Sequence, residues 1–175
     1  MAHAHDDHEH DHEHELDGDV EADDDAARAE AEQAIRRRVA LAQIRQYGDP
    51  VLRMRAQEVE TFDDELQRIA ERMIALMHDA AGVGLAATQI GIVRRMFVFH
   101  DDDEDRVVVN PVITQRSKTT EVDEEGCLSL GPVRVDVERA VEVTLEGLDA
   151  SGTPFSLELE GLPARVVQHE LDHLD

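Results

Sequence analysis

The chain has 175 residues, a length typical of one domain with a short appendage, and its formal net charge is −24 at pH 7. This negative charge argues against binding nucleic acid through its phosphates. No apolar run could span a membrane and the first residues lack the features of a signal peptide, so we expect a cytoplasmic protein.

Residues 1–25 are acidic and rich in histidine, and we expect them to be disordered. They carry twelve Asp and Glu, six His and no Lys or Arg, so they cannot bury enough apolar surface to offset the entropy of ordering. Residues 8–12 match the pattern H-E-x-x-H, but composition alone explains the match. Two interpretations remain open: a tail that buffers zinc or nickel, and a passive solubilising tail.

Two helices are predicted next. Residues 26–43 form a helical lead-in with acidic residues early and arginines late, which suits the helix dipole. Asp63 is expected to cap a second helix that runs to about Asp79. His78, near the end of that helix, is interpreted as a solvated or capping side chain. The apolar face of the second helix consists of Leu66, Ile69, Ala70, Met73, Ile74 and Met77.

Four apolar runs predict strands at residues 95–100, 107–114, 133–148 and 155–159. The acidic residues 101–105 are interpreted as a hairpin loop rather than a calcium site. A final helix follows the strands. This order predicts an α+β fold in which antiparallel strands pack around a terminal H-E-x-x-H helix.

The final helix carries the most informative pattern, His169-Glu170-Leu171-Asp172-His173. Histidines four residues apart lie on one face of a helix, so both imidazoles can bind one metal ion. Glu170 can then move protons for a metal-bound water. A pair of half-buried histidines without a metal is the alternative. The apolar stripe of this helix consists of Leu162, Val166, Val167, Leu171 and Leu174.

Cys127 is the best candidate for a third ligand, because a catalytic site needs three protein ligands and an open position. It is the only cysteine, which also excludes an intrachain disulfide. A thiolate with two imidazoles suits iron, zinc or nickel rather than magnesium or calcium. A buried, unreactive cysteine is the alternative. A zinc peptidase would explain H-E-x-x-H but would leave Cys127 and Gln89 without roles.

Three segments, in this order, resemble the signature motifs of the peptide deformylase family: residues 82–89 (GVGLAATQ), 125–129 (EGCLS) and 168–173 (QHELDH). Residues 44–53 resemble the usual start of that family, so the resemblance covers residues 44–175, the expected catalytic domain. It implies removal of the formyl group from the initiating methionine, with release of formate. It also implies that the partners are N-formylmethionyl nascent peptides, at the ribosome exit.

The resemblance further implies a role for individual residues. One divalent metal ion, usually Fe(II) with Zn(II) or Ni(II) as substitutes, would be bound by Cys127, His169 and His173. Glu170 would act as general base and acid, while the side-chain amide of Gln89 and the backbone N–H of Leu128 would stabilise the oxyanion. Val83 and Gly84 would border the substrate backbone. Leu162 and Val166 would line the methionine pocket, and Glu125 would pair with Arg134.

The chain stops two residues after His173, where the family usually continues with a glycine and a short apolar segment. We therefore expect a catalytic domain truncated at its C-terminus. We also expect the last helical turn to fray, because its carbonyl groups lack partners within the helix. A catalytically weak or inactive metal-binding protein is the resulting alternative function.

Overall fold

The computed structural model describes residues 17–102 and 104–175. It divides into two compact units, one ending at Ile35 and the other running from Arg36 to Asp175. The helix α1 (Asp17–Leu41) crosses this boundary, so residues 36–41 belong to the second unit. None of the described helices is long and apolar enough to cross a membrane.

The helix α1 differs from the prediction at both ends. Residues 17–25, which we expected to be disordered, are helical, whereas residues 1–16 lie outside the described part. Acidic residues at a helix start and the alanines that follow favour helix formation, which explains the difference. At the other end, Ala40 is only 1% exposed and shares a core with Ile44. The compact unit that contains Ala40 and Ile44 begins at Arg36, whereas the sequence analysis placed the start of the predicted catalytic domain at residue 44.

The described part of the second unit continues with a 3₁₀ turn and a long helix. The turn η1 spans Pro50–Arg53, and α2 spans Asp64–Asp79 with the Asp63 side chain accepting a hydrogen bond from Leu66 N, as predicted. The remaining elements are β1 (Gly84–Ala86), η2 (Ala87–Ile90), β2 (Met96–Asp101), β3 (Glu104–Arg116), β4 (Thr120–Gly126), β5 (Arg134–Ala140), β6 (Glu142–Leu148), β7 (Pro154–Glu160) and α3 (Gly161–Asp172).

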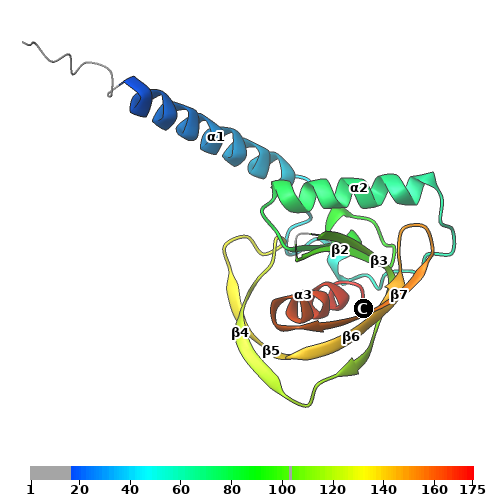
Figure 1. The fold of residues 1–175 in the computed structure, drawn as a ribbon. Helices are drawn as coiled ribbons and strands as arrows, with labels where there is room; N and C mark the ends of the chain where they lie inside the picture. Colours follow the sequence, from blue (N-terminus) through cyan, green and yellow to red (C-terminus); the bar gives the residue numbers. More distant parts are fainter. Residues whose placement is uncertain (1–16, 103) are drawn as a thin grey trace, which may run out of the picture. The chain divides into compact units, whose positions relative to one another are not determined.

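These strands form two antiparallel sheets, one of five strands in the order β1-β2-β3-β6-β7 and one of β4 and β5. The helix α2 lies on one face of the larger sheet, and α3 lies on the other, beside the smaller sheet (Figure 1). Successive side chains of β2 point to opposite faces of the sheet, which explains why a helix packs on each face. Met96 and Val98 pack in the core with α2, whereas Phe97 and Phe99 pack in the core with α3. The predicted α+β fold with strands around a terminal helix is confirmed.

The strand predictions were right in place but incomplete. Residues 133–148 form two strands in different sheets, β5 and β6, rather than one. The strand β4 was not predicted, because its sequence TEVDEEG is polar and mostly exposed. The three-residue strand β1 was missed because it lies within a glycine-rich loop sequence. The hairpin predicted at residues 101–105 is present, with β2 and β3 pairing as far as Asp101 and Glu104.

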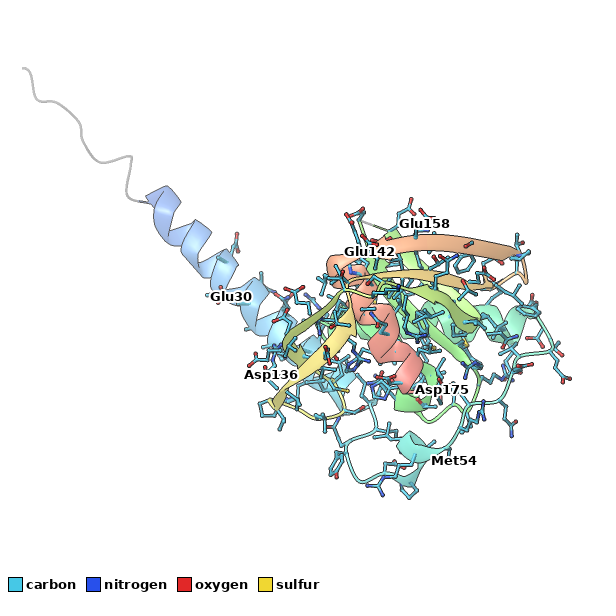
Figure 2. All side chains as sticks on the ribbon, turned by 90° about the horizontal axis from the view of Figure 1, so that it is seen from below. Glu30, Met54, Asp136, Glu142, Glu158 and Asp175 are labelled. Atoms are coloured by element: carbon cyan, nitrogen blue, oxygen red, sulfur yellow. The ribbon has the colours of Figure 1, made fainter. Side chains whose placement is uncertain are left out.

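The end of α3 is held by the rest of the fold, contrary to the expected fraying. The Thr88 hydroxyl donates to the carbonyl of His173 at 3.0 Å, and Ala56 N donates to the carbonyl of Leu174 at 2.8 Å. The Leu174 side chain is fully buried. Asp175, directly beyond α3 in Figure 2, pairs with Arg95 at 2.6 Å. Donors from other segments thus replace the missing intrahelical partners.

Candidate active site

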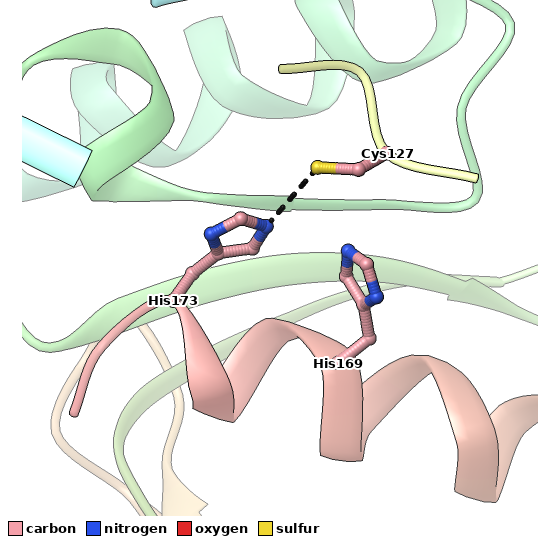
Figure 3. Close-up of side chains that lie close together, drawn as sticks. All are labelled: Cys127, His169 and His173. Carbon is pink, nitrogen blue, oxygen red and sulfur yellow. Dashed lines mark hydrogen bonds between the residues drawn. The ribbon is translucent and has the colours of Figure 1, made fainter. Parts of the chain in front are cut away.

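Three side chains that can bind a metal ion converge where α3 faces the residue after β4 (Figure 3). Cys127 Sγ lies 3.3 Å from His173 Nε2, and the ring centroids of His169 and His173 are 5.0 Å apart. One donor atom from each residue lies within 4.8 Å of the other two. Ligand atoms of a tetrahedral ion with bonds of about 2.0–2.3 Å lie roughly 3.3–3.7 Å apart, so the separation of Cys127 and His173 suits two ligands of one ion.

The surroundings set the protonation of these side chains. Burial lowers the pKa of His173 to about 4, and the neighbouring His169 contributes to the same effect. The His173 imidazole is therefore neutral at physiological pH, which is the form that coordinates metals. Burial raises the pKa of the Cys127 thiol, so binding of a metal to its thiolate releases a proton.

Glu125 orients the first histidine. Its Oε2 accepts a hydrogen bond from His169 Nδ1 at 2.9 Å, which leaves Nε2 of His169 for the metal. Arg139 donates to both oxygens of Glu125 at 2.9 and 3.0 Å, and Arg165 donates to Oε1 at 2.9 Å. Burial alone would raise the pKa of Glu125, but these hydrogen bonds outweigh it and lower the pKa to about 2. Glu125 therefore stays ionised and holds His169 in one tautomer.

The predicted pairing of Glu125 with Arg134 is wrong. In the β4–β5 ladder, Arg134 lies opposite Gly126, whereas Arg139 lies opposite Glu121. Residues two or four apart on a strand share a face, so Arg139 lies on the face of Glu125 and Arg134 on the other. The sequence analysis missed Arg139 and Arg165. If β4 had been recognised as a strand paired with β5, the alternation of side chains between the two faces of the sheet would have placed Arg139 on the face of Glu125.

Asp172 extends the same network. It lies between the two histidines in sequence and pairs with Arg139 at 2.6 Å. Arg139 thus links a carboxylate of α3 to the carboxylate that holds His169. Asp172 therefore helps to fix the α3 helix against the β4–β5 sheet.

Glu170 is buried beside the metal-binding group, with 4% of its surface exposed. Burial raises its pKa to about 8, with further contributions from the negative charges of Glu125 and Asp172. Its Oε2 has no hydrogen-bond partner among the described residues. A carboxylate with a pKa near neutrality can both accept and donate a proton at physiological pH.

The Gln89 side chain is fixed in the same region by hydrogen bonds at both ends. Its Oε1 accepts from Ala86 N at 2.8 Å, so its amide nitrogen must point the other way. That Nε2 lies 3.2 Å from Ser129 Oγ and 3.5 Å from Cys127 Sγ. Gln89 therefore presents an N–H donor directly at the metal-binding group.

A cavity of about 580 Å³ opens onto these side chains. Val83 and Leu162, 48% and 62% exposed, place apolar surface at its edge. Arg37 and Leu41, at the end of α1, also line it, and the sequence analysis did not identify them. Of the residues predicted to act on the substrate or the reaction, the cavity brings together Val83, Gly84, Gln89, Leu128, Leu162, Val166 and Glu170.

Comparison with known proteins identifies the family. The family model described as polypeptide deformylase matches residues 41–175. The chain belongs to the polypeptide deformylase family. The peptide deformylase of Thermotoga neapolitana is 48% identical over 132 residues, which cover 75% of this chain and 80% of that protein. Peptide deformylase 1 of Corynebacterium glutamicum is 43% identical over 141 residues, which cover 78% of this chain and 83% of that protein.

Solved deformylase structures agree in fold. The crystal structure of peptide deformylase from Thermotoga maritima has a TM-score of 0.73 at 46% identity, covering 75% of this chain and 89% of that chain. As a deformylase, the chain is a hydrolase that removes the N-terminal formyl group from nascent polypeptides. The family depends on a metal ion, and the Cys127, His169 and His173 side chains form a group suited to one.

Proposed function

We propose that Cys127, His169 and His173 hold the metal ion of this deformylase, with Fe(II) as the resident metal and Zn(II) or Ni(II) able to replace it. A thiolate with two imidazoles is a donor set for these ions. The unpartnered Oε2 of the buried Glu170 supports a water molecule beside these three ligands, because a buried carboxylate oxygen needs a hydrogen-bond partner and none of the described residues supplies one. A divalent ion bound there acts as a Lewis acid and lowers the pKa of water toward neutrality.

Glu170 is the proton carrier in this proposal. It takes a proton from the water whose oxygen joins the formyl carbon. It then delivers that proton to the methionine nitrogen as the C–N bond breaks, so that formate and a free amine result. Its pKa of about 8 supports both roles, since neither protonation state is strongly favoured near neutral pH.

Gln89 and Leu128 stabilise the negative charge that develops on the formyl oxygen. The Gln89 amide is held in place by Ala86 N, and the backbone N–H of Leu128 follows the metal-binding Cys127 directly. Donors fixed before the reaction need no reorganisation during it. The loss of one such donor costs about 3 kcal/mol in the barrier.

The substrate lies along the cavity edge in this proposal. Val83 and Gly84 border its backbone, while Leu162 and Val166 contact the methionine side chain. The exposed apolar surface of Val83 and Leu162 supports this assignment, because an unbranched thioether side chain gains stability from covering such surface.

The substrate class also suggests where the enzyme works. We propose that it meets nascent formylated chains near the ribosome exit, in the cytoplasm, without binding nucleic acid itself. The net charge of −24 supports the last point, since like charges repel phosphates. We further propose that residues 36–175 suffice for catalysis and that the acidic N-terminal segment is dispensable for it.

The convergence of Cys127 with the two histidines is the observation that carries the proposal, and a ligand substitution tests it. The full chain is loaded with Fe(II) without oxygen, and formate release from N-formyl-Met-Ala is measured. Cys127→Ala should abolish release and lower the bound metal. The control His8→Gln/His10→Gln removes the other H-E-x-x-H and should retain full activity. The assignment would be contradicted if the Cys127→Ala variant kept its formate release and the His8→Gln/His10→Gln variant lost it.

A further inference from the structure

A second group of metal-binding side chains lies outside the active site, at the end of α2 and the β2–β3 hairpin. His78 is in the last turn of α2, His100 is near the end of β2, and Asp105 pairs with His100 across the hairpin. His78 is exposed, as the sequence analysis interpreted it, but it also contacts Asp105, which the sequence did not reveal. Its Nε2 lies 2.8 and 2.9 Å from the two oxygens of Asp105.

The geometry of this group resembles that of the Cys127 group. His100 Nδ1 lies 2.9 Å from Asp105 Oδ1, and the three donor atoms lie within 4.8 Å of one another. The ring centroids of His78 and His100 are 5.5 Å apart at 78°, against 5.0 Å and 72° for the active-site pair. Ligand atoms on a tetrahedral ion lie roughly 3.3–3.6 Å apart. The histidine nitrogens therefore need to move about half an ångström away from the Asp105 oxygens for an ion to bind between them.

The donor set restricts the ion. Two imidazoles and one carboxylate suit zinc, nickel, cobalt or copper, whereas calcium and magnesium prefer oxygen ligands. The side chains of His78, His100 and Asp105 are 47%, 38% and 30% exposed. An ion can therefore enter from solvent and keep water in its remaining positions.

We propose that His78, His100 and Asp105 form a second binding site, for a divalent transition-metal ion of the zinc type. The ion takes the place of the protons that now link both histidines to Asp105. It ties the end of α2 to the β2–β3 hairpin. His100 N also donates to the carbonyl of Val83 at 3.0 Å, so the same connection supports the segment that borders the active-site cavity.

This site should stabilise the folded chain. His78 and Asp105 are 27 positions apart, and the folded structure brings them together. An ion that binds the native state and not the unfolded state shifts the unfolding equilibrium by mass action. Added zinc should therefore raise the midpoint of thermal unfolding in wild-type protein whose active site is already occupied.

Zinc binding to the full chain tests the proposal. Bound zinc is measured by equilibrium dialysis and elemental analysis in wild type, in His78→Gln/His100→Gln, and in the N-terminal control His8→Gln/His10→Gln. We expect the first variant to retain one zinc ion fewer per chain than wild type and to lose the zinc-dependent rise in midpoint. Its formate release before zinc addition should equal that of wild type, which shows that the active site is intact.

The single variant His78→Gln is tested as well, in case the double variant misfolds. His78 is the most exposed of the three side chains, so its substitution disturbs the fold least. Loss of this ligand should weaken zinc binding by more than the ~10–100-fold typical of an outer-sphere partner. Equal zinc content and an equal rise in midpoint in wild type and both His78 variants would overturn the proposal. The group would then be only two histidines hydrogen-bonded to Asp105.

Discussion

Gly84 provides a sharp test of the position of Glu170, because any larger residue there would displace the carboxylate. A Cβ atom built on Gly84 lies 2.9 Å from Glu170 Cδ and 2.9 Å from Val166 Cγ1, and it also meets Glu170 Oε1. All three atoms belong to α3, whose backbone is packed between the two sheets. The side chain of Glu170 must therefore move in a Gly84→Ala variant.

The size of the movement sets the expected loss. Carbon atoms in favourable contact lie about 3.5–4.0 Å apart, so the carboxylate must shift by roughly 0.6–1.1 Å. Misplacement of a catalytic group by about 1 Å costs on the order of 100-fold in rate. We therefore expect Gly84→Ala to lower kcat by about 100-fold. The metal content should stay unchanged, because Glu170 is not a proposed ligand.

Formate release and metal content measured on the same samples check this expectation. Gly82→Ala is the matched control, since its added Cβ meets Leu128 Cδ1, the movable end of a side chain, at 2.9 Å. That variant should lose much less activity. The reasoning would be refuted if Gly84→Ala kept nearly full activity, or if its loss matched a loss of metal.

Three further predictions concern Glu125 and the end of the chain. Glu125→Gln should lower metal affinity by about 10–100-fold, as measured by competition with a chelator, because His169 loses the carboxylate that orients it. In metal-free protein, the pKa of Glu125 is lowered from 4.5 to about 2, so its stabilising contribution is present above pH 4.5 and is lost as the pH falls toward 2. The difference in unfolding free energy between wild type and Glu125→Gln should therefore shrink from pH 5 to pH 3; a constant difference would contradict this. Leu174→Ala should lower the unfolding free energy by about 2–5 kcal/mol in urea titrations, because the side chain is fully buried; a loss below 1 kcal/mol would indicate a frayed end.

The sequence was sufficient to predict the residues whose chemistry depends on local spacing. The i and i+4 positions of His169 and His173 place both rings on one side of α3, and the structure shows this directly. Cys127 was identified by its residue type within a specific motif. The structure adds that β4 carries it to the same point.

Features that depend on strand register were not predictable without the strands. The partner of Glu125 is Arg139 rather than Arg134, because side chains alternate between the faces of the β4–β5 ladder. That ladder was missed, since the polar sequence of β4 lacks an apolar alternation. The contact of His78 with Asp105 was missed for a similar reason: it joins a helix end to a hairpin.

The stability of the chain end also depended on long-range contacts. The sequence places His173 two residues from the end, which predicts fraying. The structure supplies Thr88 and Ala56 as donors to the carbonyls of His173 and Leu174, and Arg95 as partner of Asp175. These partners lie 80 residues or more before the groups that they contact, so no local pattern reveals them.

Substitution of Glu170 by glutamine tests the central claim most directly. Glu170→Gln keeps the shape of the side chain but cannot accept the proton. We expect the variant to bind as much metal as wild type while formate release falls by at least ~100-fold, the lower end of the contribution of general acid–base catalysis. Near wild-type formate release from metal-loaded Glu170→Gln would contradict the role of Glu170.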